Sequence, residues 1–200
     1  MPNLPMTDGK NVTAPHTVIL GAGASIAMTR LNKEVTGKEL PSMENLVNVV
    51  GLGSLLDENG IEHSGKNFEA LFSELKDNPD FTLLTEEIEN LIYNYFAQMD
   101  ISYDVTIYDY LILSLNTNDV IATFNWDPFL SQAYARCSRL THQLPRIIHL
   151  HGNVGMGVCY KDSVMGYTHS VVGYDNAICG TCKKPFEPTP LLYPIAKKDY

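Results

Sequence analysis

The sequence lacks any apolar run near the ~18 residues that a membrane-spanning helix needs, so it predicts no membrane partner. Its first residues, MPNLPMTDGK, lack the charged and apolar regions of a secretion signal, and we expect a cytoplasmic protein. Basic residues are also few, because 14 Lys and Arg stand against 23 Asp and Glu, a formal net charge of −9. Surfaces that bind nucleic acid are normally basic, so this charge argues against broad contact with a phosphate backbone.

Cysteine is scarce as well, with four in 200 residues. Without a secretion signal, so few cysteines favour reduced thiols or metal ligands over a disulfide framework. The remaining composition, 44% hydrophobic and 18% charged, is typical of a globular chain. The length allows one domain with a small inserted module.

Three short apolar and β-branched segments predict strands at residues 16–20, 120–124 and 146–150. Between the first two, residues from about 40 to 115 show helical periodicity, with helix starts expected at Ser42, Asn67, Thr85 and Asp104. The glycine-rich stretch 51–65 is interpreted as a loop. Strands separated by helical segments predict an α/β fold with a parallel sheet.

The organisation follows from these patterns. We expect a flexible arm over 1–15, a main domain over 16–152 that contains the helical insertion, a small insertion over 153–187, and a return toward the main domain over 188–200. A doubly wound sheet usually has about six strands, whereas three are predicted, so the chain is expected to be incomplete at its C-terminus. The partners to be expected are a second copy of the chain, in a homo-oligomer, or a fused effector or sensor domain after residue 200.

The first strand runs directly into the small residues Gly21, Ala22, Gly23, Ala24 and Ser25, with a helix expected to start at Ser25. Such a turn lets the backbone approach a pyrophosphate, whose charge the free amides of a helix start can meet. The third glycine of a dinucleotide-binding fingerprint is absent. A purely structural turn between strand and helix is therefore an equal alternative.

The second strand ends in Thr-Phe-Asn-Trp-Asp, where Asn125 could hold a ribose hydroxyl or orient a water molecule. Asp127 could accept a hydrogen bond from an amide NH₂ group. Because Pro128 follows it, Asp127 taken alone is better explained as the cap of the next helix. The third strand ends in His149-Leu150-His151-Gly152, and its alternation places both histidines on one face. His151 lies nearer the carboxyl end and is the preferred general base.

These three strand ends resemble the SIR2 (sirtuin) family, and especially its bacterial SIR2-like branch that cleaves NAD+. The motifs GAGAS, TFNWD and HLHGN occur in the family's order between residues 21 and 153. The resemblance implies a Rossmann-like domain in which the glycine turn contacts the NAD+ phosphates. It also implies that Asn125 positions the ribose and the attacking water, that Asp127 contacts the nicotinamide carboxamide, and that His151 handles proton transfer.

Two departures from the family favour one branch over the other. Phe124 stands where deacetylating sirtuins commonly have glutamine, and no Gly-Ile-Pro-x-Phe-Arg stretch follows the first turn. We therefore expect an NAD+ glycohydrolase that forms nicotinamide and ADP-ribose, with a role in anti-phage defence implied by the resemblance alone. The alternatives are an NAD-dependent protein deacylase and a catalytically silent module that binds NAD or ADP-ribose.

A metal site is predicted within 153–187. Cys179 and Cys182 form a C-x-x-C pair, and Cys159 and Asp162 have the same spacing, so the four could complete a tetrahedral Zn²⁺ site in a zinc-ribbon-like insertion. Sirtuins typically carry two such cysteine pairs after the His-Gly motif. His169 is an alternative fourth ligand, and reduced thiols without metal are another alternative. Cys137 lies on an apolar helix face, where burial explains it best.

Overall fold

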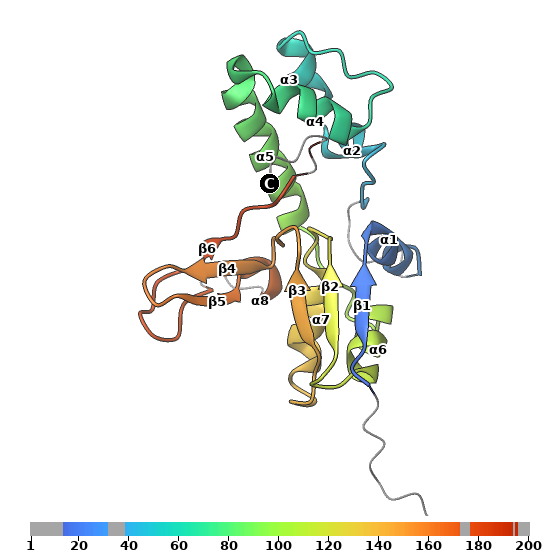
Figure 1. Ribbon diagram of the computed structural model, residues 1–200, viewed down its shortest axis with the longest axis vertical. Coiled ribbons are helices and arrows are strands. Elements are labelled where there is room, and N and C mark those ends of the chain that lie inside the picture. The colour runs from blue at the N-terminus through green and yellow to red at the C-terminus, as the bar shows by residue number, and fades with distance from the viewer. Residues whose placement is uncertain (1–13, 32–38, 173–176, 194, 196–200) are drawn as a thin grey trace, which may run out of the picture.

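The three predicted strands form one parallel sheet. The computed structural model describes residues 14–31, 39–172, 177–193 and 195. Residues 1–13 of the predicted flexible arm therefore lie outside the described part of the chain. The sheet has the order β1 (Thr17–Leu20), β2 (Val120–Thr123), β3 (Arg146–His149), as Figure 1 shows. In this register Leu20, Thr123 and His149 are neighbours at the carboxyl edge. The predicted mixed α/β architecture with a parallel sheet is confirmed.

Two helices lie behind this sheet in Figure 1, α6 (Ile107–Ser114) and α7 (Phe129–Cys137). Ile121 of the central strand is fully buried, whereas Ile19 and Ile148 of the outer strands are 69% and 47% exposed. Side chains alternate between the two faces of a strand, so one face of the sheet packs on helices while the other remains accessible on β1 and β3.

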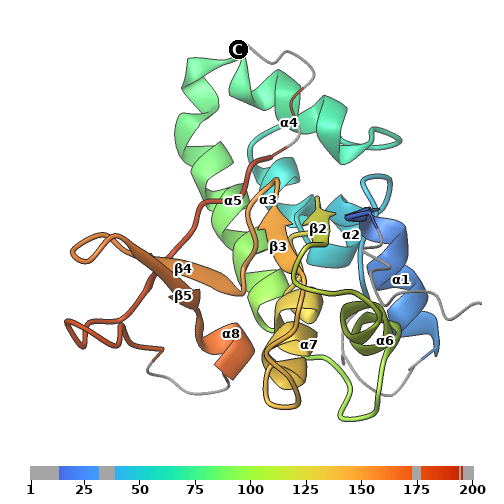
Figure 2. The same ribbon diagram turned by 60° about the horizontal axis from the view of Figure 1, so that its bottom comes forward.

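The other helices gather above the carboxyl edge of the sheet (Figures 1 and 2). They are α2 (Leu46–Val50), α3 (Gly53–Glu58), α4 (Phe68–Lys76), a 3₁₀ turn (Pro79–Phe81) and α5 (Thr82–Ala97). Their apolar faces meet in a core that includes Phe68 and Phe72, whose ring centroids are 5.1 Å apart. Tyr193 returns from the end of the chain to pack on Phe72 and on Trp126. This helical group therefore covers the edge at which the candidate site lies.

Two predicted helix starts are wrong by three residues. The first helix, α1, spans Ala22–Leu31 and not from Ser25 onward, because the amide of Ala24 already bonds to the carbonyl of Gly21 and closes the first turn. Helix α5 begins at Thr82 and not at Thr85. The 3₁₀ turn before it, capped by the Asn78 side chain and begun by Pro79, continues directly into the helix.

The predicted loop over 51–65 is also wrong, since it contains α3. Leu52 and Leu56 are 1% and 0% exposed, so burial of apolar surface outweighs the low helix propensity of the nearby glycines. The predicted helix start at Ser42 is wrong as well, because residues 43–45 form a turn and α2 begins at Leu46. Asn67 caps α4 by accepting from the amide of Ala70. For α6, Thr106 rather than Asp104 is the cap, in a reciprocal capping box with Asp109.

The small insertion forms a second sheet, which is antiparallel with β4 in the centre. Its strands are β5 (Val164–Tyr167), β4 (Met156–Cys159) and β6 (Glu187–Pro188), and a short helix, α8 (His169–Val172), follows β5. Gly157 and Gly166 face each other in the register. A Cβ atom at Gly166 would lie 2.3 Å from the Phe186 ring, so any other residue at this position would require that ring to move. Across the described residues, the search for a helix able to cross a membrane finds none.

Candidate functional site

A cavity of about 220 Å³ lies at the carboxyl edge of the parallel sheet, beneath the helical group. Three polar side chains line it, those of Asn125, Asp127 and His151, together with Ala22 at the start of α1. The remaining lining is apolar and comes from Leu40, Pro41, Met43, Leu46, Phe96, Phe124 and Trp126. An apolar cavity with a few convergent polar groups is the usual form of a small-molecule site.

Asn125 has its amide NH₂ group turned into the protein. The nitrogen donates to the carbonyl of Gly21 at 3.1 Å and to the hydroxyl of Ser25 at 2.9 Å, and it lies 3.4 Å from the Tyr108 hydroxyl. Within the part of the chain that the structure describes, no partner contacts the amide oxygen. The Asn125 side chain therefore presents an acceptor to a ligand in the cavity.

Asp127 is 3% exposed, and one carboxylate oxygen accepts from the amide of Phe129 at 3.2 Å. Burial raises the pKa of the Asp127 carboxyl to about 6, against the lowering effect of hydrogen bonds from Ser25 and from backbone amides. The predicted cap is thus present in part, although the helix itself begins after Pro128. The same carboxyl group also lines the cavity, so the two predicted roles are compatible.

The two histidines after β3 occupy different places. His151 lines the cavity, with its ring 4.9 Å from that of Phe124 in an edge-to-face contact. His149 instead lies 3.4 Å from the Ser131 hydroxyl of α7 and is absent from the cavity lining. Burial lowers the pKa of His149 to about 4, so this ring stays neutral at physiological pH. The structure therefore places His151, and not His149, in the cavity lining.

Gly152 fixes the chain direction immediately after His151. Its φ angle is +76°, and a Cβ atom there would lie 2.4 Å from the carbonyl oxygen of Pro190. Only glycine combines this left-handed conformation with such a close approach of backbone. The structure thus explains why glycine follows His151, since any side chain at position 152 would displace the loop that carries His151.

The residues of the glycine turn after β1 differ in their exposure. Gly21 and Gly23 are exposed, with open space where a Cβ atom would be, and Ala22 lines the cavity. Ser25 is 0% exposed, and its hydroxyl lies 2.6 Å from that of Tyr108. The turn and the helix start are thus accessible to a ligand, whereas the Ser25 side chain faces the interior behind Asn125.

Sequence reasoning did not single out two residues of this site. Tyr108 falls at an apolar helix position, so its hydroxyl gave no signal. Asn153 is 1% exposed and donates to the carbonyl oxygens of Asn125 and Asp127 at 3.2 and 2.6 Å. It thereby ties the loop after β3 to the loop after β2. Its position directly after the His-Gly pair was the available clue.

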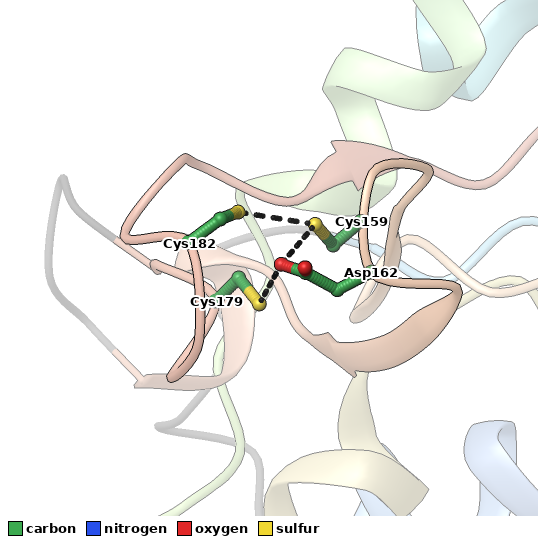
Figure 3. Close-up of side chains that lie close together, drawn as sticks. All are labelled: Cys159, Asp162, Cys179 and Cys182. Carbon is green, nitrogen blue, oxygen red and sulfur yellow. Dashed lines mark hydrogen bonds between the residues drawn. The ribbon is translucent and has the colours of Figure 1, made fainter.

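The four predicted metal ligands come together in the insertion, as Figure 3 shows. The Cys159 and Cys182 sulfurs are 3.4 Å apart, and one Asp162 oxygen lies 3.4 Å from Cys159 and 3.2 Å from Cys179. A disulfide needs ~2.05 Å, so the sulfurs are not bonded. Two sulfurs on one tetrahedral zinc ion lie about 3.8 Å apart, close to this spacing. The cluster could hold a metal ion.

The two ligand pairs of the cluster, Cys159 with Asp162 and Cys179 with Cys182, are each followed by a residue with a positive φ angle. The residues that follow the second ligand of each pair, Ser163 and Lys183, have φ angles of +53° and +59°. The amides of Cys182 and Thr181 donate to the Cys179 sulfur and lower its pKa, which favours the thiolate that a metal requires. His169, the alternative ligand, starts α8 and is not part of the cluster. Cys137 is buried on α7, as predicted.

A scan of the sequence against models of known protein families and a search of curated proteins found no match. Any functional assignment therefore rests on the residues and their geometry.

Proposed function

We propose that this chain is a SIR2-like NAD+ glycohydrolase, which cleaves NAD+ to nicotinamide and ADP-ribose. The observation that carries the proposal is the convergence of Asn125, Asp127 and His151 on one largely apolar cavity. Two adjacent parallel strands supply these residues at their carboxyl ends, where ligands of open α/β sheets bind. The Rossmann-like character of the sheet is part of the same proposal.

The reaction determines what these residues must do. The bond between the ribose C1′ and the nicotinamide nitrogen breaks, and its electron pair leaves with nicotinamide, which becomes neutral. Positive charge develops on the ribose, a water oxygen bonds to C1′, and one proton of that water is released. The site must fix the sugar, hold one water molecule in line and exclude other water.

Each polar side chain suits one of these tasks. The free amide oxygen of Asn125 accepts a hydrogen bond from the water or from a ribose hydroxyl. Asp127 accepts from the carboxamide NH₂ of nicotinamide, and when ionised it also stabilises the developing positive charge. His151 takes the proton of the attacking water, because a histidine ring titrates near neutral pH.

The size and lining of the cavity support a binding mode for only part of the dinucleotide. Its volume of about 220 Å³ is below the ~300 Å³ at which pockets for whole small ligands begin. We therefore assign the cavity to nicotinamide and its ribose. The pyrophosphate would lie over the exposed turn at Gly21 and Gly23, where the first amides of α1 are free. The apolar lining from Phe96, Phe124 and Trp126 would exclude stray water.

We also propose that Cys159, Asp162, Cys179 and Cys182 bind one Zn²⁺ ion, as three thiolates and one carboxylate. The ion would stabilise a zinc-ribbon-like insertion. It is structural in this proposal and supplies no chemistry to the cavity, since its ligands belong to a separate sheet.

The test follows nicotinamide and ADP-ribose when NAD+ is incubated with the protein expressed from its natural gene. We expect release in equal amounts, and loss of turnover in the His151→Ala variant. His142→Ala is the matched control, because His142 is an exposed histidine that does not line the cavity. Release that requires an acetylated peptide would indicate a deacylase. Binding of ADP-ribose without any turnover would indicate a silent module, and either result would overturn the proposal.

A further inference from the structure

Tyr108 brings a hydroxyl group into the candidate site from outside the three strand ends. It belongs to α6, is 2% exposed, and its oxygen lies 2.6 Å from the Ser25 hydroxyl and 3.4 Å from the Asn125 nitrogen. A phenylalanine would fill the same space in the core without the cost of burying a hydroxyl group. Among the described residues, the hydroxyl group has hydrogen-bond partners only in the candidate site, Ser25 and Asn125, so its role is to be sought there.

Burial raises the pKa of Tyr108 well above its ordinary value, so the phenol keeps its proton and stays a neutral hydrogen-bonding group. The Ser25 hydroxyl has one hydrogen to donate and can accept two hydrogen bonds. Asn125 donates to it at 2.9 Å, and the Tyr108 oxygen lies within hydrogen-bond distance of both residues. Tyr108, Ser25 and the Asn125 amide group therefore form one hydrogen-bonded cluster behind the cavity.

We propose that Tyr108 is a positioning residue of the NAD+-cleaving site, which acts together with Ser25 to hold Asn125 in its cavity-facing orientation. The proposal rests on the function proposed above. The Tyr108 hydroxyl fixes that of Ser25 by a contact of 2.6 Å, and both hydroxyl oxygens face the Asn125 nitrogen. The Asn125 nitrogen is held inward by the same hydroxyl groups, so its oxygen stays on the cavity side.

The helix that carries Tyr108 is itself fixed. Asp109, the next residue, completes the capping box with Thr106 and receives two hydrogen bonds from the Arg136 guanidinium of α7. A bidentate pair of this kind sets both distance and orientation. The Tyr108 hydroxyl is thus placed by two elements that do not belong to the cavity, as pre-organisation of a site requires.

The test compares Tyr108→Phe with Tyr93→Phe, a matched loss of a hydroxyl group. The Tyr93 hydroxyl donates to the carbonyl of Val154 at 3.2 Å, and Tyr93 does not line the cavity. We expect Tyr108→Phe to lower kcat for nicotinamide release about 10-fold to 100-fold with little change in KM, since misplaced reacting groups cost about this much. Tyr93→Phe should change neither constant, while the two variants lose similar thermal stability.

A double variant separates positioning from a general weakening of the fold. Tyr108 and Ser25 lie on one hydrogen-bond chain, so adding Tyr108→Phe to Ser25→Ala should lower kcat no further. Equal kcat in the Tyr108→Phe and Tyr93→Phe variants, or losses that multiply in the double variant, would overturn the role of Tyr108 while leaving the glycohydrolase intact. No nicotinamide release by the unmodified protein would overturn both.

Discussion

Asp127 has the least favourable electrostatic position in the candidate site. It is almost completely buried, and no basic side chain is among the groups that set its pKa. Hydrogen bonds from Ser25 and from backbone amides offset only part of the cost of burial, so its pKa stays raised at about 6. A carboxyl group kept in such a place is more often functional than structural.

The raised pKa gives the first prediction. The native carboxyl binds a proton more tightly than the unfolded one, so its contribution to stability is lost as the pH rises from about 4 to 6. A shift of about 2 units corresponds to about 3 kcal/mol. The free energy of unfolding of the wild type should therefore fall by about 3 kcal/mol between pH 4 and pH 7 through this group. The Asp127→Asn variant lacks the titrating carboxyl group and should not show this fall. Urea unfolding at several pH values measures it, and parallel curves for the two proteins would contradict the burial account.

A bidentate ion pair connects helices α6 and α7. Arg136 binds Asp109 through two nitrogens and also donates to the carbonyl of Ser102 at 2.6 Å. The Asp109 side chain is 5% exposed, so it depends on this partner.

Arg136→Ala should therefore destabilise the protein. The variant leaves a buried carboxylate without its cation, and because Arg136 is itself 31% exposed we expect the lower end of the usual cost, about 3 kcal/mol. Arg139→Ala, at an exposed arginine on the same side of the molecule, should change stability by less than about 0.5 kcal/mol. Equal losses in denaturant titrations of the two variants would show that the ion pair does not stabilise the helix pair.

The small antiparallel sheet gives a prediction about metal. Purified protein should contain one zinc ion per chain, and Cys179→Ser should lose it, because three ligands hold the ion far less tightly than four. Cys137→Ser removes a thiol outside the cluster and should keep the metal. Elemental analysis gives the result. Full zinc content in the Cys179→Ser variant, or none in the wild type, would refute the proposed site.

The elements found from the sequence are those with a strong local signal. The three parallel strands were predicted from β-branched runs, and α4 from its asparagine cap. Helix α3 was missed because its glycines outweighed two leucines that become buried only through tertiary packing. Strands β4 and β5 were missed because each spans four residues and includes a glycine.

The residues of the candidate site also differ in whether they have a local signal in the sequence. Asn125, Asp127 and His151 were identified because each follows a predicted strand end. Tyr108 and Asn153 were not, since their roles depend on partners that only the folded chain brings near. The sequence also did not predict that His149 and His151 have different surroundings, because the strand ends at His149 and the alternation does not continue beyond it.

For the whole molecule, the cavity depends on two layers meeting. The polar side chains come from loops after β2 and β3, while Leu46 and Phe96 come from the helical group above them. Leu40 and Met43 come from the segment that leads into α2. Neither layer encloses a ligand alone. Trp126 connects them, since its ring packs on Phe96 and Tyr193 with centroids 5.8 and 5.0 Å away. The proposed reaction requires such an enclosure, because only one water molecule is to reach the ribose.

The most direct measurement is a crystal structure of the His151→Ala variant with NAD+ bound, because this variant should bind the dinucleotide without cleaving it. The account predicts nicotinamide and its ribose in the cavity, with the carboxamide on Asp127, C1′ beside Asn125 and the pyrophosphate over Gly21 and Gly23. Nicotinamide bound away from Asn125 and Asp127, or a cavity that stays closed to NAD+ at saturating concentration, would contradict it.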